Sequence, residues 1–405
     1  MKNNDTLNNT DSTENINDTD NGGIPADIDE SELEEMMAGG IMARTSFNAI
    51  IGSNNRSIEI FRLFLMLCAC IFTLGLPSFR LSSYIQSACG FAPLAFFILS
   101  GFLVLGDKEK REERIVRAIK HSGIAFAAML VFNVAVNVAL FRFFDVGFMP
   151  LFRSKRLWFD FIVLNVWPFT VGDAIWYVQS LFYAYIAIWF LNKWKLLRFD
   201  RFIVIALLLF AVIDGELCGL IPLRINIYNF FPPNFFNRAL PYLLLGGILA
   251  DGIAFWTQLD PIMYVAGIVI GFGMVIAEPK FLNHFGFTGY YGHLIGMGVI
   301  AVFACLLLFW NVINREIDDC ESSSLFDFFL SKKGTNLIYF VYQQTAMSFG
   351  FLIVRFIGSD FFNKISPYLG LITFVILFGF ITAAVALYRI VIVKKAEKRN
   401  GEIIE

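Results

Sequence analysis

Charged residues are scarce in this sequence. Asp, Glu, Lys and Arg make up 16% of its 405 residues, whereas 57% of the residues are hydrophobic and 47 are phenylalanine. A soluble globular protein carries about 25% charged residues, because its surface must stay in contact with water. The composition therefore excludes an ordinary water-soluble protein of this length and favours a chain embedded in a lipid bilayer.

Sequence patterns for metal binding, disulfide frameworks and secretion are also missing. The six cysteines have no metal-ligand spacing, and two that lie two residues apart in an apolar run point to different faces of a helix. We therefore expect neither a zinc site nor a set of disulfides, and no other metal. The first apolar run begins only near Ile58, too late for an N-terminal signal peptide. The cysteines are Cys68, Cys70, Cys89, Cys218, Cys305 and Cys320.

The N-terminal region is polar and acidic. Up to Glu35 it carries eleven acidic residues against one Lys, so it cannot bury a core, and we predict a disordered tail over residues 1–55. Within it, the stretch from Glu32 to Gly40 resembles the double-glycine leader of secreted bacterial peptides, with a spacing one residue longer than usual. The leader interpretation predicts cleavage after Gly40. The alternative is a short amphipathic helix that ends at a glycine cap.

Long apolar runs occupy most of the chain after the tail. About ten of them are long enough to cross a bilayer, since a spanning helix needs about 20 apolar residues. The sequence therefore predicts an all-α, polytopic integral membrane bundle over residues 56–392, followed by a basic cytoplasmic tail over residues 393–405. The predicted membrane helices lie near residues 58–78, 87–105, 122–142, 174–191, 202–219, 238–256, 260–277, 292–312, 336–357 and 368–392.

Lys and Arg residues indicate how the bundle is oriented. They gather in the loops 106–121 and 192–201 and in the C-terminal tail, which all fall on one side if the number of spans is even. Because cytoplasmic loops carry an excess of Lys and Arg, we expect a multi-pass plasma-membrane protein with both termini in the cytoplasm. The loop 143–173 departs from this pattern, since it holds three basic residues but is predicted to lie outside.

Polar residues inside the predicted spans are candidates for function, because placing them in a bilayer is costly. Glu59 and Arg62, three residues apart on the first helix, share one face and can form an ion pair. On the fourth helix, a stripe at helical spacing suits either a cavity wall or a packed aromatic seam; it consists of Trp176, Gln179, Ser180 and Tyr183. Histidine is the usual general base near neutral pH, and the chain has three: His121, His284 and His293.

Several segments, taken together and in order, resemble the membrane acyltransferase-3 family, whose members O-acylate sugars, cell-wall polymers and other extracytoplasmic acceptors. The likeness runs from about Arg56 to Tyr388, and its most specific element is the sequence Phe-Phe-Ile-Leu-Ser-Gly-Phe-Leu at residues 96–103. A Ser-Gly pair in a membrane helix lets another backbone or a ligand approach closely. The other similar segments are Glu59–Arg62, Arg114–Arg117, Trp176–Tyr183, Arg238–Gly246 and Asn336–Tyr342.

The resemblance implies transfer of an acyl group from cytoplasmic acyl-CoA, with acetyl-CoA the favoured donor, to a hydroxyl of an extracytoplasmic acceptor such as a glycan or cell-envelope polymer. It implies that Arg114 and Arg117 hold the phosphates of the donor. Ser100 and Gly101 would then allow close passage of the acyl thioester. The partners implied are the lipid bilayer and this acceptor, and no nucleic acid.

The same resemblance assigns residues around the acceptor. Glu59 would orient Arg62 at the start of the first helix. The acceptor cavity would be lined by Trp176, Gln179, Tyr183 and Arg238.

Both histidines that the family uses in catalysis are replaced in this chain. The first falls eleven residues after Arg62, at Thr73, and the second falls at Tyr342. Neither hydroxyl is a general base near pH 7, and losing a positioned base typically costs about 10²–10⁴-fold in rate. An active enzyme therefore needs another base, for which we favour His293. The alternatives are a catalytically inactive homologue that binds a lipid or acyl donor, and a transport or immunity-type membrane protein on the same scaffold.

Overall fold

The computed structural model describes residues 56–74, 82–144, 155–165, 175–215, 235–284 and 295–314, together with parts of 342–383. Nearly all of these residues are helical, and they contain no β-strand, which confirms the all-α prediction. The predicted tails at 1–55 and 393–405 lie outside the described residues, as does the leader-like pair Gly39-Gly40.

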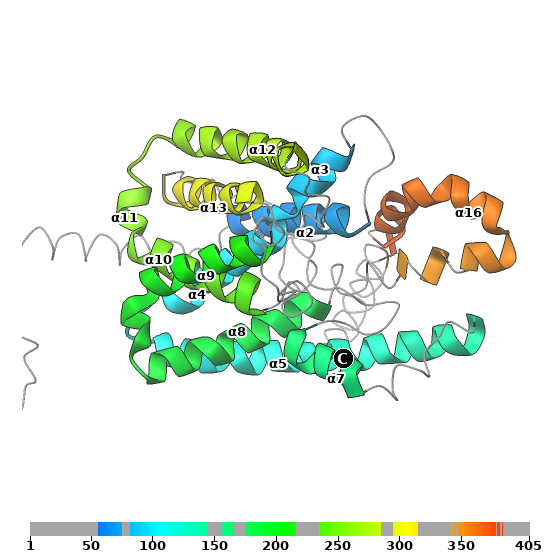
Figure 1. The fold of residues 1–405 in the computed structure, drawn as a ribbon, viewed down its shortest axis with the longest axis horizontal. Helices are drawn as coiled ribbons and strands as arrows, with labels where there is room; N and C mark the ends of the chain where they lie inside the picture. The colour runs from blue at the N-terminus through cyan, green and yellow to red at the C-terminus, as the bar shows by residue number, and fades with distance from the viewer. Residues whose placement is uncertain are drawn as a thin grey trace, which may run out of the picture. The chain divides into compact units, whose positions relative to one another are not determined.

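The helices lie where the apolar runs predict them (Figure 1). Several boundaries differ. The segment predicted at 87–105 is two helices divided at Gly90, and the one predicted at 122–142 begins already at Arg111. The helix predicted at 260–277 continues to His284, a helix occupies Lys155–Leu164 inside the predicted loop 143–173, and the last helical stretch begins at Ser359 rather than at 368. The charged residues from Arg111 onward are good helix formers, so α5 extends beyond its apolar part. The elements are α2 (Arg56–Leu74), α3 (Ser82–Cys89), α4 (Phe91–Leu105), α5 (Arg111–Phe144), α7 (Lys155–Leu164), α8 (Ile175–Lys193), η1 (Leu196–Phe199), α9 (Asp200–Gly215), η3 (Phe235–Ala239), α10 (Leu240–Asp251), α11 (Ile253–Trp256), α12 (Pro261–His284), α13 (Ile295–Asn314), α16 (Ser359–Ile365) and η4 (Ser366–Tyr368).

Five helical stretches among the described residues are long and apolar enough to cross a membrane: Ser82–Leu105, Arg111–Leu140, Pro261–His284, Ile295–Asn314 and Ser359–Leu377. The chain is therefore a helical membrane protein that associates with bilayer lipid. The predicted count of ten spans stays a prediction. Helices α9 and α10, with 16 and 12 residues, are shorter than the roughly 20 residues that a full crossing needs.

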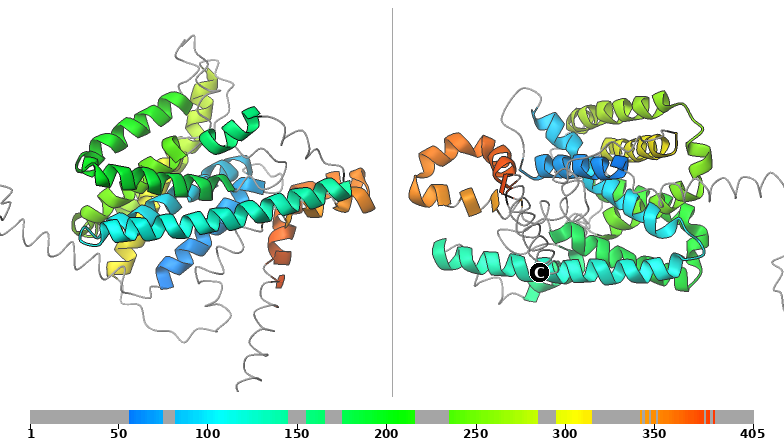
Figure 2. Two further views of the ribbon diagram at one scale, coloured as in Figure 1. Left: turned by 90° about the horizontal axis from the view of Figure 1, so that it is seen from below. Right: turned by 180° about the vertical axis from the view of Figure 1, so that it is seen from behind.

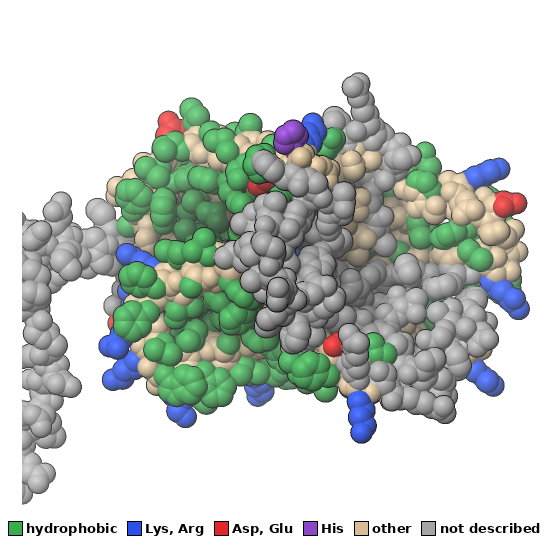
Figure 3. Space-filling model, viewed as in Figure 1, with side chains coloured by type: hydrophobic (Ala, Val, Ile, Leu, Met, Phe, Trp, Pro, Cys, Tyr) green, Lys and Arg blue, Asp and Glu red, His purple; other side chains and the backbone are tan. Residues whose placement is uncertain are grey.

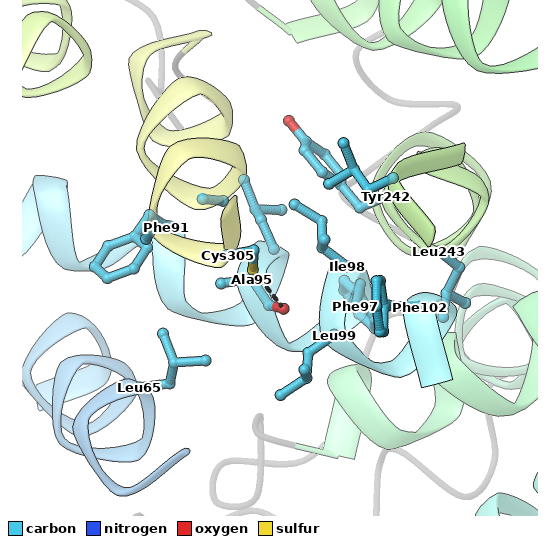
Figure 4. Close-up of a cluster of buried hydrophobic side chains, with 14 of the residues drawn as sticks. Leu65, Phe91, Ala95, Phe97, Ile98, Leu99, Phe102, Tyr242, Leu243 and Cys305 are labelled. Atoms are coloured by element: carbon cyan, nitrogen blue, oxygen red, sulfur yellow. Dashed lines mark hydrogen bonds between the residues drawn. The ribbon is translucent and has the colours of Figure 1, made fainter. Parts of the chain in front are cut away.

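Helix α4 lies at the centre of the packed helices. Within its spanning stretch 78% of the most apolar window is buried, against 22% for α5 and for α12. Phe97, Ile98 and Phe102 are fully buried, and the ring of Phe102 stacks on that of Phe309 at 4.0 Å between centroids. Figure 4 shows this cluster between α4, α10 and α13, with the Cys305 thiol 3.7 Å from the carbonyl oxygen of Ala95. The most specific sequence segment is thus also the structural core.

The outer helices leave apolar side chains exposed. Figure 2 shows α5 as one long helix beside α8, where the rings of Phe126 and Phe182 lie 6.1 Å apart. Away from α8, Ile124 and Val131 of α5 are exposed. Hydrophobic side chains cover much of the coloured part of the visible face, whereas Lys and Arg side chains lie mainly around its edges (Figure 3). Such apolar faces suit contact with lipid chains.

One helix crossing at the core depends on glycine. A Cβ on Gly101 of α4 would overlap the carbonyl oxygen of Leu243 on α10, and a Cβ on Gly246 of α10 would overlap that of Ile98 on α4. The two backbones are therefore in direct contact, which only small residues permit. Dispersion attraction between the closely packed atoms stabilises such a crossing in a membrane. A second glycine-dependent crossing joins α12 to α13.

Contacts between helix ends define two ends of the bundle. What we call the basic end contains the start of α2, the α4–α5 turn, the end of α10, and the end of α13 (left in Figure 1). Its contacts are Lys108–Asp251 (3.4 Å), Asn311–Ser57 (3.1 Å) and Asn314–Thr257 (3.2 Å).

What we call the opposite end contains the end of α2, α3, the end of α12 and the start of α13. Its contacts are Gln86–Phe72 (3.2 Å), Lys280–Tyr84 (5.9 Å to the ring centroid) and Gly296–Glu278 (2.9 Å).

Candidate functional site

The predicted ion pair on α2 is present. Arg62 Nη1 lies 2.8 Å from Glu59 Oε1, and the two side chains are 12% and 28% exposed. The other oxygen of Glu59, Oε2, is buried and has no hydrogen-bond partner among the described residues. The pair thus holds a largely buried charged group on α2.

Aromatic side chains from distant segments meet at the first turns of α8. The ring of Phe97 in α4 stacks on that of Tyr177 at 4.7 Å, and the guanidinium of Arg238 in η3 lies 5.8 Å from the Trp176 ring. The ring of Tyr183 meets that of Phe235 edge-on at 5.6 Å. The structure therefore brings side chains of η3 against two of the predicted residues of α8, Trp176 and Tyr183.

Gln179 belongs to a buried polar cluster between α7 and α8. Its Nε2 donates to the carbonyl oxygen of Phe161 at 2.7 Å and lies 3.3 Å from the Tyr183 hydroxyl. Asn165, just after α7, donates to the carbonyl oxygen of Trp176 at 2.9 Å and to the hydroxyl of Ser180. Because a carbonyl oxygen can only accept a hydrogen bond, the amide nitrogen of each side chain must face it. The amide oxygens of Gln179 and Asn165 therefore point away from these carbonyls. Those oxygens, Gln179 Oε1 and Asn165 Oδ1, are buried without a partner among the described residues.

The sequence reasoning included Ser180 in the polar stripe of the fourth helix but missed Asn165. Both are at least 98% buried, since the exposed fractions of Asn165 and Ser180 are 2% and 0%. Asn165 has a positive φ of 61°, a conformation that Asn tolerates better than most residues. A polar residue that directly follows an apolar helical run was the available signal.

Arg114 and Arg117 point to different partners. Arg114 turns back onto the end of α4, where Nη1 donates to the carbonyl oxygen of Leu103 at 3.0 Å and Nη2 lies 2.9 Å from Asp107 Oδ2. Arg117 is 63% exposed and pairs with Glu113 at 2.6 Å. Arg114 thus satisfies a helix-end carbonyl, and Arg117 is the one of the two that faces outward at the basic end.

The Ser-Gly pair of α4 is engaged by protein. The side chain of Ser100 shares a hydrogen bond with Tyr185 of α8. The space beside Gly101, which the resemblance assigns to the passing thioester, is filled by the backbone of Leu243. A small residue permits the close approach of either a ligand or another backbone. At Gly101 the structure contains the approach of another backbone, that of Leu243.

Thr73 and Tyr342, the positions where the family has histidine, both lie at the second half of α2. Thr73 belongs to this helix, and Tyr342 packs against it. Thr73 is exposed, and its hydroxyl donates to the carbonyl oxygen of Ala69 at 2.9 Å. Tyr342 is 4% exposed, packs against Met66 and Cys70, and donates to the carbonyl oxygen of Gly370 at 3.0 Å. Both hydroxyl protons are therefore used by backbone carbonyls. His293 lies outside the described residues, whereas His121 and His284 are exposed.

Glu278 is a second residue that the sequence reasoning missed. The predicted span ends at residue 277, but α12 continues to His284 and includes Glu278. Glu278 Oε1 accepts the backbone N–H of Gly296 at 2.9 Å, at the first turn of α13. Its Oε2 is buried and has no hydrogen-bond partner among the described residues. An acid directly before Pro279 at the end of an apolar run was the signal for it.

The described residues contain no group of three His, Cys, Asp or Glu side chains that could hold a metal ion. No protein-family model, curated protein or solved structure matches this chain. The class that the fold itself defines is a helical integral membrane protein.

Proposed function

We propose that this chain is an acyltransferase-3-like membrane protein that transfers an acyl group from acyl-CoA to a hydroxyl of an extracytoplasmic acceptor. The acyl-CoA, with acetyl-CoA favoured, binds at the basic end, which faces the cytoplasm of a plasma membrane. The acceptor, a glycan or another cell-envelope polymer, binds from the other side.

The observation that carries this proposal is the meeting of three of the family-like segments at the start of α8. Phe97 of α4 stacks on Tyr177 of α8 at 4.7 Å, and Arg238 of η3 lies 5.8 Å from the Trp176 ring. These residues are far apart in the chain, so their meeting is not a property of one amphipathic helix. A site for a polar substrate inside a membrane bundle needs this kind of convergence.

Donor phosphates fit the basic end through its exposed cations. Arg117, Lys108 and Lys110 are exposed there, and a guanidinium binds phosphate through two parallel hydrogen bonds. The Arg117–Glu113 pair is exposed, and such pairs contribute only about 0–1 kcal/mol, so a phosphate can replace Glu113. Arg114 supports this surface by fixing the end of α4.

A second candidate function is binding of an acyl donor or lipid without turnover. The observation that favours it is the state of the two replaced positions, because Thr73 and Tyr342 both donate their hydroxyl protons to backbone carbonyls. In that case the scaffold keeps the donor surface and lacks a base. The same experiment distinguishes the two functions.

The experiment measures equilibrium binding of acetyl-CoA to the purified full chain in detergent, together with release of free CoA detected by mass spectrometry. Wild type is compared with Arg117→Ala and with Arg114→Ala/Arg117→Ala. The matched control is Arg198→Ala/Arg201→Ala, which removes two arginines at the same three-residue spacing from exposed positions. A thermal unfolding curve of each variant shows whether the fold is kept.

The proposal expects saturable binding that Arg117→Ala weakens by about tenfold, as the loss of one charged hydrogen bond of roughly 1.5 kcal/mol predicts. It also expects CoA release above that of heat-denatured protein. Binding without release supports the second candidate. Equal binding by wild type and the double variant rejects the donor site at the basic end.

A further inference from the structure

We propose that the turn between α8 and α9, residues 193–201, binds anionic phospholipid, with its cations on the headgroup phosphate and its aromatic rings against the lipid chains. The turn consists of the end of α8, the short helix η1 and the start of α9. The proposal adds a lipid partner of defined charge to the protein and does not depend on acyl transfer.

The turn carries an excess of positive charge. Four of its nine residues are cations and one, Asp200, is an acid, so its net charge is +3. Asp200 Oδ1 accepts the backbone N–H of Arg201 at 2.7 Å. All four cations are exposed, and none forms an ion pair within the part of the chain that the structure describes. These cations are Lys193, Lys195, Arg198 and Arg201.

The α4–α5 turn differs in this respect. Three of its cations each have an acidic partner within 3.4 Å: Lys108 with Asp251, Arg114 with Asp107, and Arg117 with Glu113. An anion that binds at residues 193–201 therefore gains charge interactions without first displacing an acidic side chain. Phosphate oxygens are suitable partners for such cations, because guanidinium groups bind them through charge-assisted hydrogen bonds.

The turn is located at the end of the bundle where α5 begins. Val178 of α8 belongs to one buried cluster with Met129 of α5, and further along α8 the ring of Phe182 lies against Gly123 of α5. Helices α5 and α8 therefore run antiparallel, and the end of α8 lies near the start of α5. A turn that joins two apolar helices at the end of a membrane bundle lies at the depth of the lipid headgroups.

Exposed aromatic rings accompany the cations. Trp194, Phe199 and Phe202 are 64%, 42% and 73% exposed. The guanidinium of Arg198 lies 4.6 Å from the centroid of the Phe199 ring, so charge and apolar surface are adjacent. Tryptophan is enriched where a bilayer meets water, because its ring is apolar and its N–H is polar. A phospholipid contacts both the cations and the rings, whereas a free phosphate uses only the cations.

The backbone of the turn is fixed by its own contacts. Leu197, in η1, is 9% exposed and belongs to the main buried cluster of the bundle. The backbone N–H of Trp194 donates to the carbonyl oxygen of Phe190, and that of Lys195 donates to the carbonyl oxygen of Asn192, both at 3.0 Å. A surface whose backbone is already ordered loses less conformational entropy when a ligand binds.

The test measures lipid binding to the full chain in detergent by native mass spectrometry, which resolves each bound lipid. Phosphatidylglycerol is the anionic probe and phosphatidylcholine is the zwitterionic one. Arg198→Gln/Arg201→Gln removes two cations of the turn, and Arg198→Lys/Arg201→Lys keeps their charge. The matched control is Arg355→Gln/Lys364→Gln, which removes two exposed cations elsewhere in the chain. A thermal unfolding curve of each variant shows whether the fold is kept.

We expect wild type to bind phosphatidylglycerol more tightly than phosphatidylcholine. Each Lys or Arg near an anionic lipid surface contributes about fivefold in affinity, so the glutamine pair should weaken phosphatidylglycerol binding about 25-fold. The lysine pair and the control should change it by less than about threefold. Phosphatidylcholine binding should be the same in all four proteins, and excess inorganic phosphate should not displace the bound phosphatidylglycerol.

Four results would overturn the proposal. Wild type and the glutamine pair bind phosphatidylglycerol equally, wild type binds both lipids equally, or the control loses as much affinity as the glutamine pair. In the fourth, inorganic phosphate displaces the lipid, and the site then takes free phosphate. If the glutamine pair lowers the unfolding temperature, Lys193→Gln/Lys195→Gln replaces it with the same expected loss. Acetyl-CoA binding is expected to be unchanged in these variants, so failure of the lipid site leaves the proposed function intact.

Discussion

Arg114 Nη2 lies 2.9 Å from Asp107 Oδ2, and the same guanidinium donates to the carbonyl oxygen of Leu103. This arrangement directs the side chain of Arg114, from the first turn of α5, back onto the turn between α4 and α5. The guanidinium satisfies a carbonyl that the end of α4 leaves without an intrahelical partner. Arg114 and Arg117 therefore have different roles, since Arg114 fixes the α4–α5 turn and Arg117 faces solvent.

The first prediction follows from this difference. Arg114→Ala removes the donor to the Leu103 carbonyl and the ion-pair partner of Asp107, and should destabilise the fold by about 1–3 kcal/mol. Arg117→Ala breaks only an exposed pair and should change stability by less than about 1 kcal/mol. Intrinsic tryptophan fluorescence during heating measures both. Equal unfolding temperatures for the two variants would contradict the distinction.

The second prediction concerns the α4–α10 crossing. Gly101→Ala and Gly246→Ala each place a methyl group on the backbone of the facing helix, so each should destabilise the protein by about 2 kcal/mol or more. Gly273→Ala is the matched control, because it is also in a membrane helix and has open space around its Cα. The control should keep or slightly raise the unfolding temperature, since Ala is the better helix former. If Gly273→Ala lowers the unfolding temperature as much as the other two substitutions, the α4–α10 backbone contact is not the cause of their effect.

The third prediction concerns the buried amides. Gln179→Leu removes the buried side-chain hydrogen bond to the Phe161 carbonyl and should cost about 1–3 kcal/mol. Asn165→Ala removes two hydrogen bonds and places Ala at a positive φ, so it should cost at least as much. Asn363→Ala, at an exposed position on α16, serves as the control. Thermal unfolding of the three variants in the same detergent provides the comparison.

The sequence predicts the helix positions well, because apolar length is the dominant signal in a membrane protein. It also predicts the Glu59–Arg62 pair, whose partners are three residues apart on one helix. Contacts between helices are harder to predict. The filling of the space beside Gly101 by Leu243 depends on how α4 and α10 cross, and a small residue alone does not say whether a backbone or a ligand approaches it.

Boundaries explain the other differences. The sequence predicts Arg114 in a loop because charged residues interrupt the apolar run, but these residues form the first turns of α5, and only the α4–α5 turn brings Arg114 back to Leu103. It predicts Glu278 in a loop for the same reason, although α12 continues beyond it. Asn165 and Gln179 come together because α7 packs on α8, which no spacing within either helix reveals.

Release of CoA from acetyl-CoA by the purified wild-type chain is the measurement that tests the proposed function most directly. The protein is reconstituted in lipid nanodiscs, and free CoA is quantified by mass spectrometry against a heat-denatured sample. The account predicts saturable, protein-dependent release of CoA. A wild-type chain that binds acetyl-CoA and releases no CoA above the denatured sample would contradict acyl transfer and leave donor binding as the function.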